Sequence, residues 1–189
     1  MAQYKAKMPI FAPIQTEPDN AAATYGKGVT LGKMISVNLT PNYNEAPLYG
    51  DDAQAEYEKE FKDLDVSLNT TFLPTDAYSA MFGSTVTSGT GDESIKSNVQ
   101  DEAKYGGLGF VIGEKVNGAA KFWVIWLPKV KFAPPGGNYQ TKGDNITWNT
   151  PSISGKGIAD NLGNWREMES YATESEALTA LKTKAGMTA

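Results

Sequence analysis

Glu58 and Glu60 are the two side chains of this sequence whose spacing best fits a catalytic pair. Alternate residues of a strand point to the same face, so these carboxyl groups could serve as the acid and the base or nucleophile of a glycosidase. No aromatic residue alternates with them on that face as a platform for a sugar ring. The sequence therefore favours an exposed strand face, with a glycosidase as the alternative.

Asp51 and Asp52 form the next candidate, as half of a metal site. Calcium loops of the EF-hand type place their ligands at fixed spacing around a DxDxDG pattern, which is absent here. We expect these two residues to be solvated loop carboxylates or to form an ion pair with another subunit. No metal site is predicted.

The chain of 189 residues contains no His and no Cys. This composition excludes Ser-His-Asp triads, HExxH zinc sites, cysteine nucleophiles and thiolate metal sites. No Ser precedes a Lys by three residues, no GxxxxGK[ST] segment occurs, and Leu31 replaces the third Gly of a GxGxxG pattern that begins at Gly26. We therefore predict a protein without catalytic residues or cofactors, and not an enzyme.

The charged residues are 17 basic and 22 acidic side chains, for a net charge of −5, and the only arginine is Arg166. Arginine makes most bidentate contacts to guanine and phosphate, so a sequence-specific DNA reader is not expected. The longest apolar run, Phe122–Leu127, is far shorter than the roughly 20 residues of a membrane-spanning helix. The N-terminus is a poor signal peptide, and we expect synthesis in the cytoplasm and no membrane partner.

The first two thirds of the chain read as strands with interruptions. Residues 1–24 are expected to form an N-terminal arm, and period-two alternation from Val29 to Leu39 predicts a half-buried strand interrupted at Lys33. Residues 41–55 show no period and are expected to be a long inter-strand loop. The alternation then resumes and slips by one residue near Lys62 and Asp63, as a β-bulge or a tight turn requires. A two-turn helix follows from Thr75 to Gly83, and then a flexible loop to Asp92.

The last third predicts a hairpin, a strand and a helix. Strands at Tyr105–Gly113 and Ala120–Phe132 flank an Asn117-Gly118 turn, and the second strand must become an edge or bulge at Pro128. Another strand is expected from Asp144 to Ser154. Residues 173–186 read as a helix that begins with a capping box. The four tryptophans are interpreted as core and interface aromatics: Trp123, Trp126, Trp148 and Trp165.

These elements predict a mainly β (α+β) fold in one domain, residues 1–189. Five or six strands with a short internal helix and a C-terminal helix are typical of a β-sandwich or barrel with peripheral helices.

Five segments, taken together and in order, resemble one family. They are LYGDDA at 48–53, EFKDLDVSLNTTFLP at 60–74, KFWVIWLPKVKF at 121–132, QTKGDNITWNTPSISG at 140–155 and ALTALKTKAG at 177–186. The family is that of the major tail proteins, or tail tube proteins, of long-tailed, non-contractile bacteriophages of the type that infects Gram-positive hosts. None of the five segments is a catalytic motif.

The resemblance implies a structural virion protein that assembles into hexameric rings stacked as a hollow tail tube. Its implied partners are copies of itself, tape-measure, tail terminator and distal tail proteins, and duplex DNA as transient cargo without sequence recognition. Its implied location is the phage tail. A lone β-sandwich recognition module, for cell-wall glycan or for a baseplate, is the alternative.

Two sets of site residues follow from this reading. The 41–55 segment is expected to contact a neighbouring subunit or ring through Leu48, Tyr49, Gly50, Asp51 and Asp52. A basic channel would bind duplex DNA and stall its exit, so an acidic inner wall is expected, with Lys129 and Lys131 elsewhere. The candidates for that wall are Glu56, Glu58, Glu60, Asp63 and Asp65.

Overall fold

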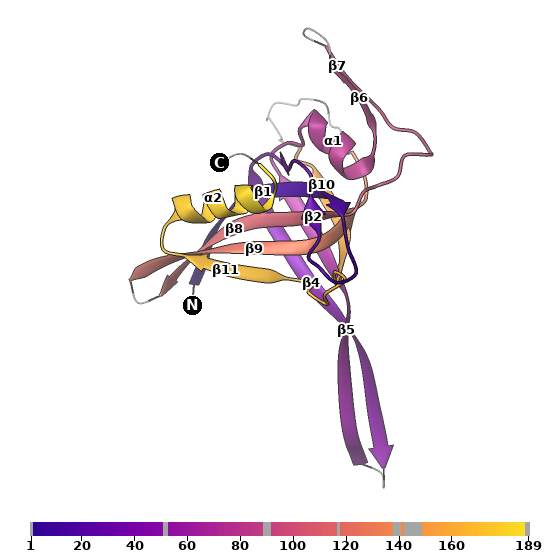
Figure 1. Ribbon diagram of the computed structural model, residues 1–189, viewed down its shortest axis with the longest axis vertical. Helices are drawn as coiled ribbons and strands as arrows, with labels where there is room; N and C mark the ends of the chain where they lie inside the picture. Colours follow the sequence, from indigo (N-terminus) through magenta and orange to yellow (C-terminus); the bar gives the residue numbers. More distant parts are fainter. Residues whose placement is uncertain are drawn as a thin grey trace.

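The computed structural model describes residues 2–50, 53–88, 92–116, 118–137, 141 and 149–187 (Figure 1). These ranges contain eleven strands and two helices. The strands are β1 (Ala2–Thr16), β2 (Thr24–Tyr25), β3 (Val29–Thr30), β4 (Met34–Gly50), β5 (Ala53–Thr70), β6 (Thr85–Ser88), β7 (Glu93–Lys96), β8 (Gly106–Val116), β9 (Ala119–Phe132), β10 (Ser152–Ile158) and β11 (Glu167–Tyr171). The helices are α1 (Thr75–Phe82) and α2 (Glu174–Lys184).

One antiparallel sheet carries most of the chain. Its strand order is β2-β1-β8-β9-β10-β5-β4, with β3 beside β1 and β11 beside β9. The sheet curls so that β1 and β4 contact each other, and its two halves face each other across a core in a sandwich-like arrangement. The fold is thus mainly β with two helices, as the sequence predicts. The short β6–β7 hairpin forms a separate sheet.

The core between the two halves of the sheet is formed by alternate residues of its central strands. Leu64, Val66 and Leu68 of β5 face Leu108 and Phe110 of β8. Helix α1 adds three buried side chains at one end of this core, namely Ala77, Met81 and Phe82. The expected two-turn helix is confirmed, including its end at Gly83, which adopts a φ of 73°.

A second, smaller core lies between the sheet and α2, which crosses the outer side of β8 and β9 (Figure 1). Ala177 and Leu181 of the helix pack there on Trp126, which is 1% exposed. The capping box is confirmed, because Thr173 Oγ1 accepts from the Glu176 backbone N–H and the Glu176 carboxylate accepts from the Thr173 N–H.

The hairpin of β8 and β9 also agrees with its sequence signals. Gly118 has a φ of 87°, which suits the expected tight turn, while Asn117 lies outside the described residues. Between the pairs Leu108–Leu127 and Gly106–Val130 the register shifts, so that Pro128 and Lys129 oppose one residue. The sequence predicts that the strand becomes an edge or a bulge at Pro128, and the structure has the bulge. It lies where the partner of β9 changes from β11 to β10.

The predicted N-terminal arm is wrong, because most of it is strand β1, in the interior of the sheet. Ile10, Phe11 and Ala12 are fully buried, and β1 pairs with β8 along its length. Pro9 and Pro13 obscured the strand pattern. Their carbonyl oxygens accept from Leu31 and Gly26 on the β2–β3 side, so their missing N–H groups leave the β8 ladder intact.

The predicted 41–55 loop is also wrong, since β4 continues to Gly50 and β5 begins at Ala53. The side chains of residues 43–47 and 56–60 are exposed on both faces of the hairpin, so no hydrophobic period marks these stretches. The Val29–Leu39 strand is divided into β3 and β4 at Gly32, whose φ is 72°.

Two further segments differ from the sequence-based expectation. The loop expected between Gly83 and Asp92 contains strand β6, which pairs with β7. Strand β10 begins at Ser152 rather than Asp144, and residues 142–148 lie outside the described part of the chain.

Candidate functional site: the projecting β4–β5 hairpin

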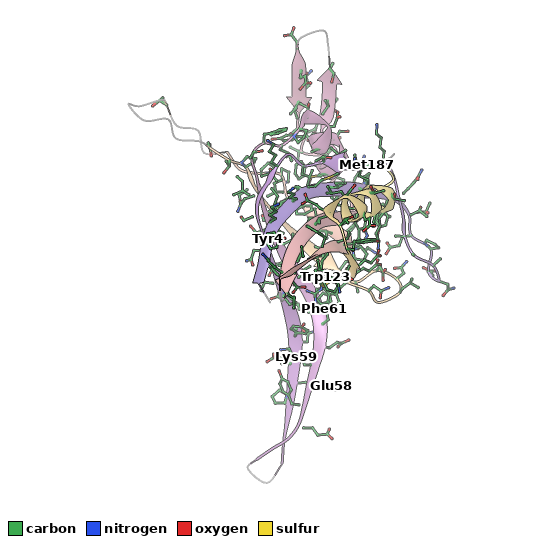
Figure 2. All side chains as sticks on the ribbon, turned by 90° about the vertical axis from the view of Figure 1, so that its left-hand side faces the viewer. Tyr4, Glu58, Lys59, Phe61, Trp123 and Met187 are labelled. Carbon is green, nitrogen blue, oxygen red and sulfur yellow. The ribbon has the colours of Figure 1, made fainter. Side chains whose placement is uncertain are left out.

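The distal part of the β4–β5 hairpin leaves the body of the molecule as a two-stranded ribbon (Figure 1). All side chains from 43 to 47 and from 56 to 60 are exposed, on both faces. Figure 2 shows Glu58 and Lys59 on this projecting part and Phe61 nearer the body. A two-stranded ribbon without a covered face is marginally stable in water by itself.

A bulge at Lys62 decides which side chains share a face of the hairpin. Tyr43 pairs with Phe61 and Asn42 with Asp63, so Lys62 is the extra residue of a bulge, one of the two alternatives that the sequence leaves open at this point. The extra residue shifts the alternation by one, and therefore even-numbered residues before it and odd-numbered residues after it share a face. This acid face carries all five predicted wall residues: Glu56, Glu58, Glu60, Asp63 and Asp65.

The opposite, aromatic face carries Tyr43, Tyr57 and Phe61. The Phe61 ring stacks on Trp165 with centroids 4.9 Å apart and an interplanar angle of 11°, and Tyr43 meets Phe61 edge-on at 6.2 Å. The Lys59 ammonium lies 4.4 Å from the centroid of the Tyr43 ring and 3.0 Å from a carboxylate oxygen of Glu45. Trp165 thus anchors this face of the hairpin to the body.

A polar cluster anchors the acid face where the hairpin leaves the body. The Asn42 amide donates to carboxylate oxygens of Asp63 and Asp65 at 2.7 Å each, and Lys156 of β10 lies 3.2 and 3.0 Å from the same two side chains. The Asn42 hydrogen bond first, and Lys156 after it, hold the pKa of both aspartates below the ordinary value. The root of the hairpin is therefore held on both faces.

The same sheet face continues across β10 to β9. There Lys156 pairs in register with Lys131, which lies 3.7 Å from Glu102, and Lys129 bonds to Glu17 at 2.6 Å. A shallow, open depression of about 480 Å³ lies between Lys131, Lys156 and Tyr105. The expectation that Lys129 and Lys131 lie away from the acidic residues is wrong, because the pairing of β5, β10 and β9 aligns them on one face.

Three of the five residues predicted for subunit contact lie at the described end of the hairpin. Leu48, Tyr49 and Gly50 end β4 and pair with Glu56, Gln54 and Ala53. Asp51 and Asp52 lie outside the described residues, and only the backbone is described for the other three.

The structure gives no enclosed setting to the candidate catalytic pair. Glu58 and Glu60 are exposed on the projecting ribbon, whereas a glycosidase holds its carboxyl groups in a cleft around the sugar. In the described residues, no group of three or more acidic side chains is placed to hold a metal ion. Across the same residues, neither helix has the length and apolar character to span a membrane.

Sequence reasoning missed Lys156 and Trp165, which hold the root of the hairpin. Both are distant in sequence from the residues that they contact, with 93 positions separating Lys156 from Asp63. No local pattern signals such a contact. Of the other tryptophans, Trp126 is buried and Trp123 is half-buried, with its indole N–H donating to Glu114 at 2.8 Å, while Trp148 is outside the described residues.

A scan against models of protein families finds none that matches this chain, and a search of curated proteins also finds no match.

Proposed function

We propose that this protein is a structural subunit that assembles with copies of itself into hexameric rings stacked as a phage tail tube, the conduit for DNA during ejection. The family resemblance of the sequence suggests this function. The observation that carries it in the structure is the β4–β5 hairpin, which projects from the body with both faces exposed. Surface of this kind is explained most simply by a neighbouring subunit that covers it.

The free edge of β4 supports assembly as well. This strand ends the sheet, so one of its edges has no strand partner among the described residues. Pro41 and Pro47 are both odd-numbered, so their backbone nitrogen atoms point to the same edge of β4. A proline has no N–H to donate to β5, so this edge is the free one. The backbone N–H groups of the other odd-numbered residues, such as Tyr43 and Glu45, also point to the free edge and can donate to a partner strand.

The body part of the acid face, with Asp63 and Asp65, is our candidate for the lumen wall. Its three lysines, Lys129, Lys131 and Lys156, are all within ion-pair distance of carboxylates. Lysines that are paired with carboxylates bind DNA phosphates weakly, so duplex DNA would pass along this wall without being held. Tape-measure, terminator and distal tail proteins remain the proposed partners at the tube ends.

Electron microscopy and light scattering of the purified protein test this proposal. We expect rings or tubes with sixfold symmetry. A species that stays at the monomer mass of 20.3 kDa over a wide concentration range would contradict it and would favour the recognition module.

Shortening the hairpin tests the observation that carries the proposal. Ala46 lies opposite Glu58, so a two-residue Asn-Gly turn in place of residues 47–57 preserves the register. We expect a folded monomer, with the circular dichroism of the body unchanged, that forms no tubes. Normal tubes from this variant would show that the hairpin is not needed for assembly.

A further inference from the structure

The hairpin carries almost all of the net charge of the protein. Residues 51–65 contain seven acidic side chains and two lysines, a net of −5, which equals the net charge of the whole chain. The rest of the molecule is therefore neutral overall. Within the projecting part, Lys59 is paired with Glu45 on the aromatic face, so it does not offset Glu56, Glu58 and Glu60 on the acid face.

A second projecting region carries the opposite charge. The start of β1 and the end of β8 lie together, because Gln3 pairs with Glu114 and Ala2 with Lys115 (Figure 1). We call this region the lysine end and define it by Lys5, Lys115 and Lys121, all of which are exposed. Lys121 pairs in register with Glu114 and Lys115 with Ala120, so these two lysines lie on opposite faces of the β8–β9 hairpin. The ion pairs found among the described residues involve none of the three.

The carboxylates nearest to the lysine end are already engaged. Glu114, which pairs in register with Lys121, is 5% exposed and accepts from the Trp123 indole N–H at 2.8 Å. The Lys121 ammonium lies 4.9 Å from the centroid of the same Trp123 ring. Glu174 bonds to Lys7. With three lysines against the single carboxylate of Glu114, the lysine end thus carries a net positive charge, whereas the acid face of the hairpin carries a net negative charge.

We propose that the acid face of the hairpin, at Glu56, Glu58 and Glu60, docks on the lysine end of a second copy of this chain. Charge complementarity favours this occupant over duplex DNA, because the acidic hairpin of the same molecule repels phosphate. The two patches differ, so the contact is heterologous and propagates from copy to copy until a ring closes or a filament grows. This inference rests on the proposed self-assembly and names the surfaces that carry it.

Charge reversal on each side tests the contact. One variant changes Glu56, Glu58 and Glu60 to Lys, and a second changes Lys5, Lys115 and Lys121 to Glu. Each variant has only like charges at the contact, so we expect the concentration needed for assembly to rise at least about tenfold. An equimolar mixture should recover assembly, because each hairpin then meets an end of opposite charge on the other variant.

A matched control changes the exposed Lys27, Lys96 and Lys104 to Glu, which alters the net charge by the same amount away from the lysine end. It should assemble like the wild type. The proposal is overturned if either reversed variant assembles normally, if the mixture does not recover, or if the control fails as badly. Wild-type protein that stays monomeric would instead refute the proposed function itself.

A covalent readout does not depend on how the reversed variants fold. The chain contains no Cys, so Glu58→Cys combined with Lys115→Cys or with Lys121→Cys adds the only two thiols. Mild oxidation of assembled protein should link copies into a ladder of disulfide-bonded oligomers with at least one of the two pairings. Oligomers no more abundant than with Glu58→Cys alone would overturn the proposed contact.

Discussion

At the scale of single residues, two glycines of β8 make room for the largest buried side chain. A Cβ atom on Gly107 would lie 2.1 Å from Trp126 Cζ2, and one on Gly109 would lie 2.5 Å from Trp126 Cε3 and 2.4 Å from Leu181 Cδ1. The indole can therefore lie flat on the strand beneath α2. Glycine is required here by packing and not by a turn.

Gly109→Ala should consequently destabilise the protein by about 1–3 kcal/mol, the usual cost of overpacking a core. The shift in the denaturation midpoint, at constant slope, measures it. Gly136→Ala is the control, since nothing lies within 4 Å of a Cβ there and its φ is not positive. Equal midpoints for both variants would contradict the packing argument.

Asn42 gives a prediction about pH at the root of the hairpin. Asp63 and Asp65 have lowered pKa values in the folded protein, first because of Asn42 and then Lys156. Their stabilisation is present above the pKa of the unfolded chain and is lost as the pH falls through the lower, folded value. Asn42→Ala should therefore lose less stability than the wild type between neutral pH and about pH 3.

Denaturation with urea across that pH range measures the difference. Asn44→Ala is the matched control, because Asn44 is exposed and is the next residue of β4 on the same face, toward the hairpin tip. If Asn42→Ala and Asn44→Ala follow the same pH curve, the amide does not set the pKa of the two aspartates.

At the scale of elements, the bulge at Lys62 orients the whole hairpin. It keeps Phe61 on the side of Trp165 while Glu58 and Glu60 share a face with Asp63. A strand without the extra residue would carry its side chains to the opposite faces from that point onward. One residue thus determines which face of the hairpin is acidic.

Deletion of Lys62 should therefore break the stack of Phe61 on Trp165 and leave the body folded. We expect its near-ultraviolet circular dichroism to match that of Phe61→Ala, whereas Lys62→Ala, which retains the residue count, should match the wild type. A deletion variant with the wild-type spectrum would mean that the register is set elsewhere.

At the scale of the whole molecule, charge is separated between a neutral body and an acidic hairpin. On the body, the lysines of the outer sheet face are held near carboxylates, as in the cluster of Lys156 with Asp63 and Asp65. Because these lysines are paired with carboxylates, a tube wall formed by this face would bind DNA only weakly. Loss of the carboxylates would expose a basic row across β5, β10 and β9.

Tubes made from a variant with Asp63→Lys and Asp65→Lys should therefore retain duplex DNA that wild-type tubes release. Co-sedimentation measures the retention, and it should fall steeply as salt rises because counterion release drives the binding. The Asp63→Asn and Asp65→Asn pair is the control for loss of charge without reversal. If the lysine variant retains no DNA, this face does not line the lumen.

Local signals in the sequence determined much of the fold. Thr173 and Glu176 specified the start of α2, Gly118 indicated the tight turn before β9, and Pro128 indicated an edge or a bulge, of which the structure has the bulge. The slip of phase near Lys62 located the second bulge. Each of these features depends on atoms within a few residues of one another, so the sequence alone is sufficient to indicate them.

Only the tertiary structure decided what β1 and residues 41–55 do. Pro9 and Pro13 are compatible with strand β1 because their nitrogen atoms face the β2–β3 side. No hydrogen bond between β1 and β8 is lost there. Residues 43–47 and 56–60 of the distal hairpin are exposed on both faces, so hydrophobic alternation could not reveal these stretches. Contacts between segments that are distant in sequence place Trp165 and Lys156 at the root of the hairpin and Lys131 beside the acid face. Sequence neighbours do not determine such contacts, because the register between distant strands is set by packing.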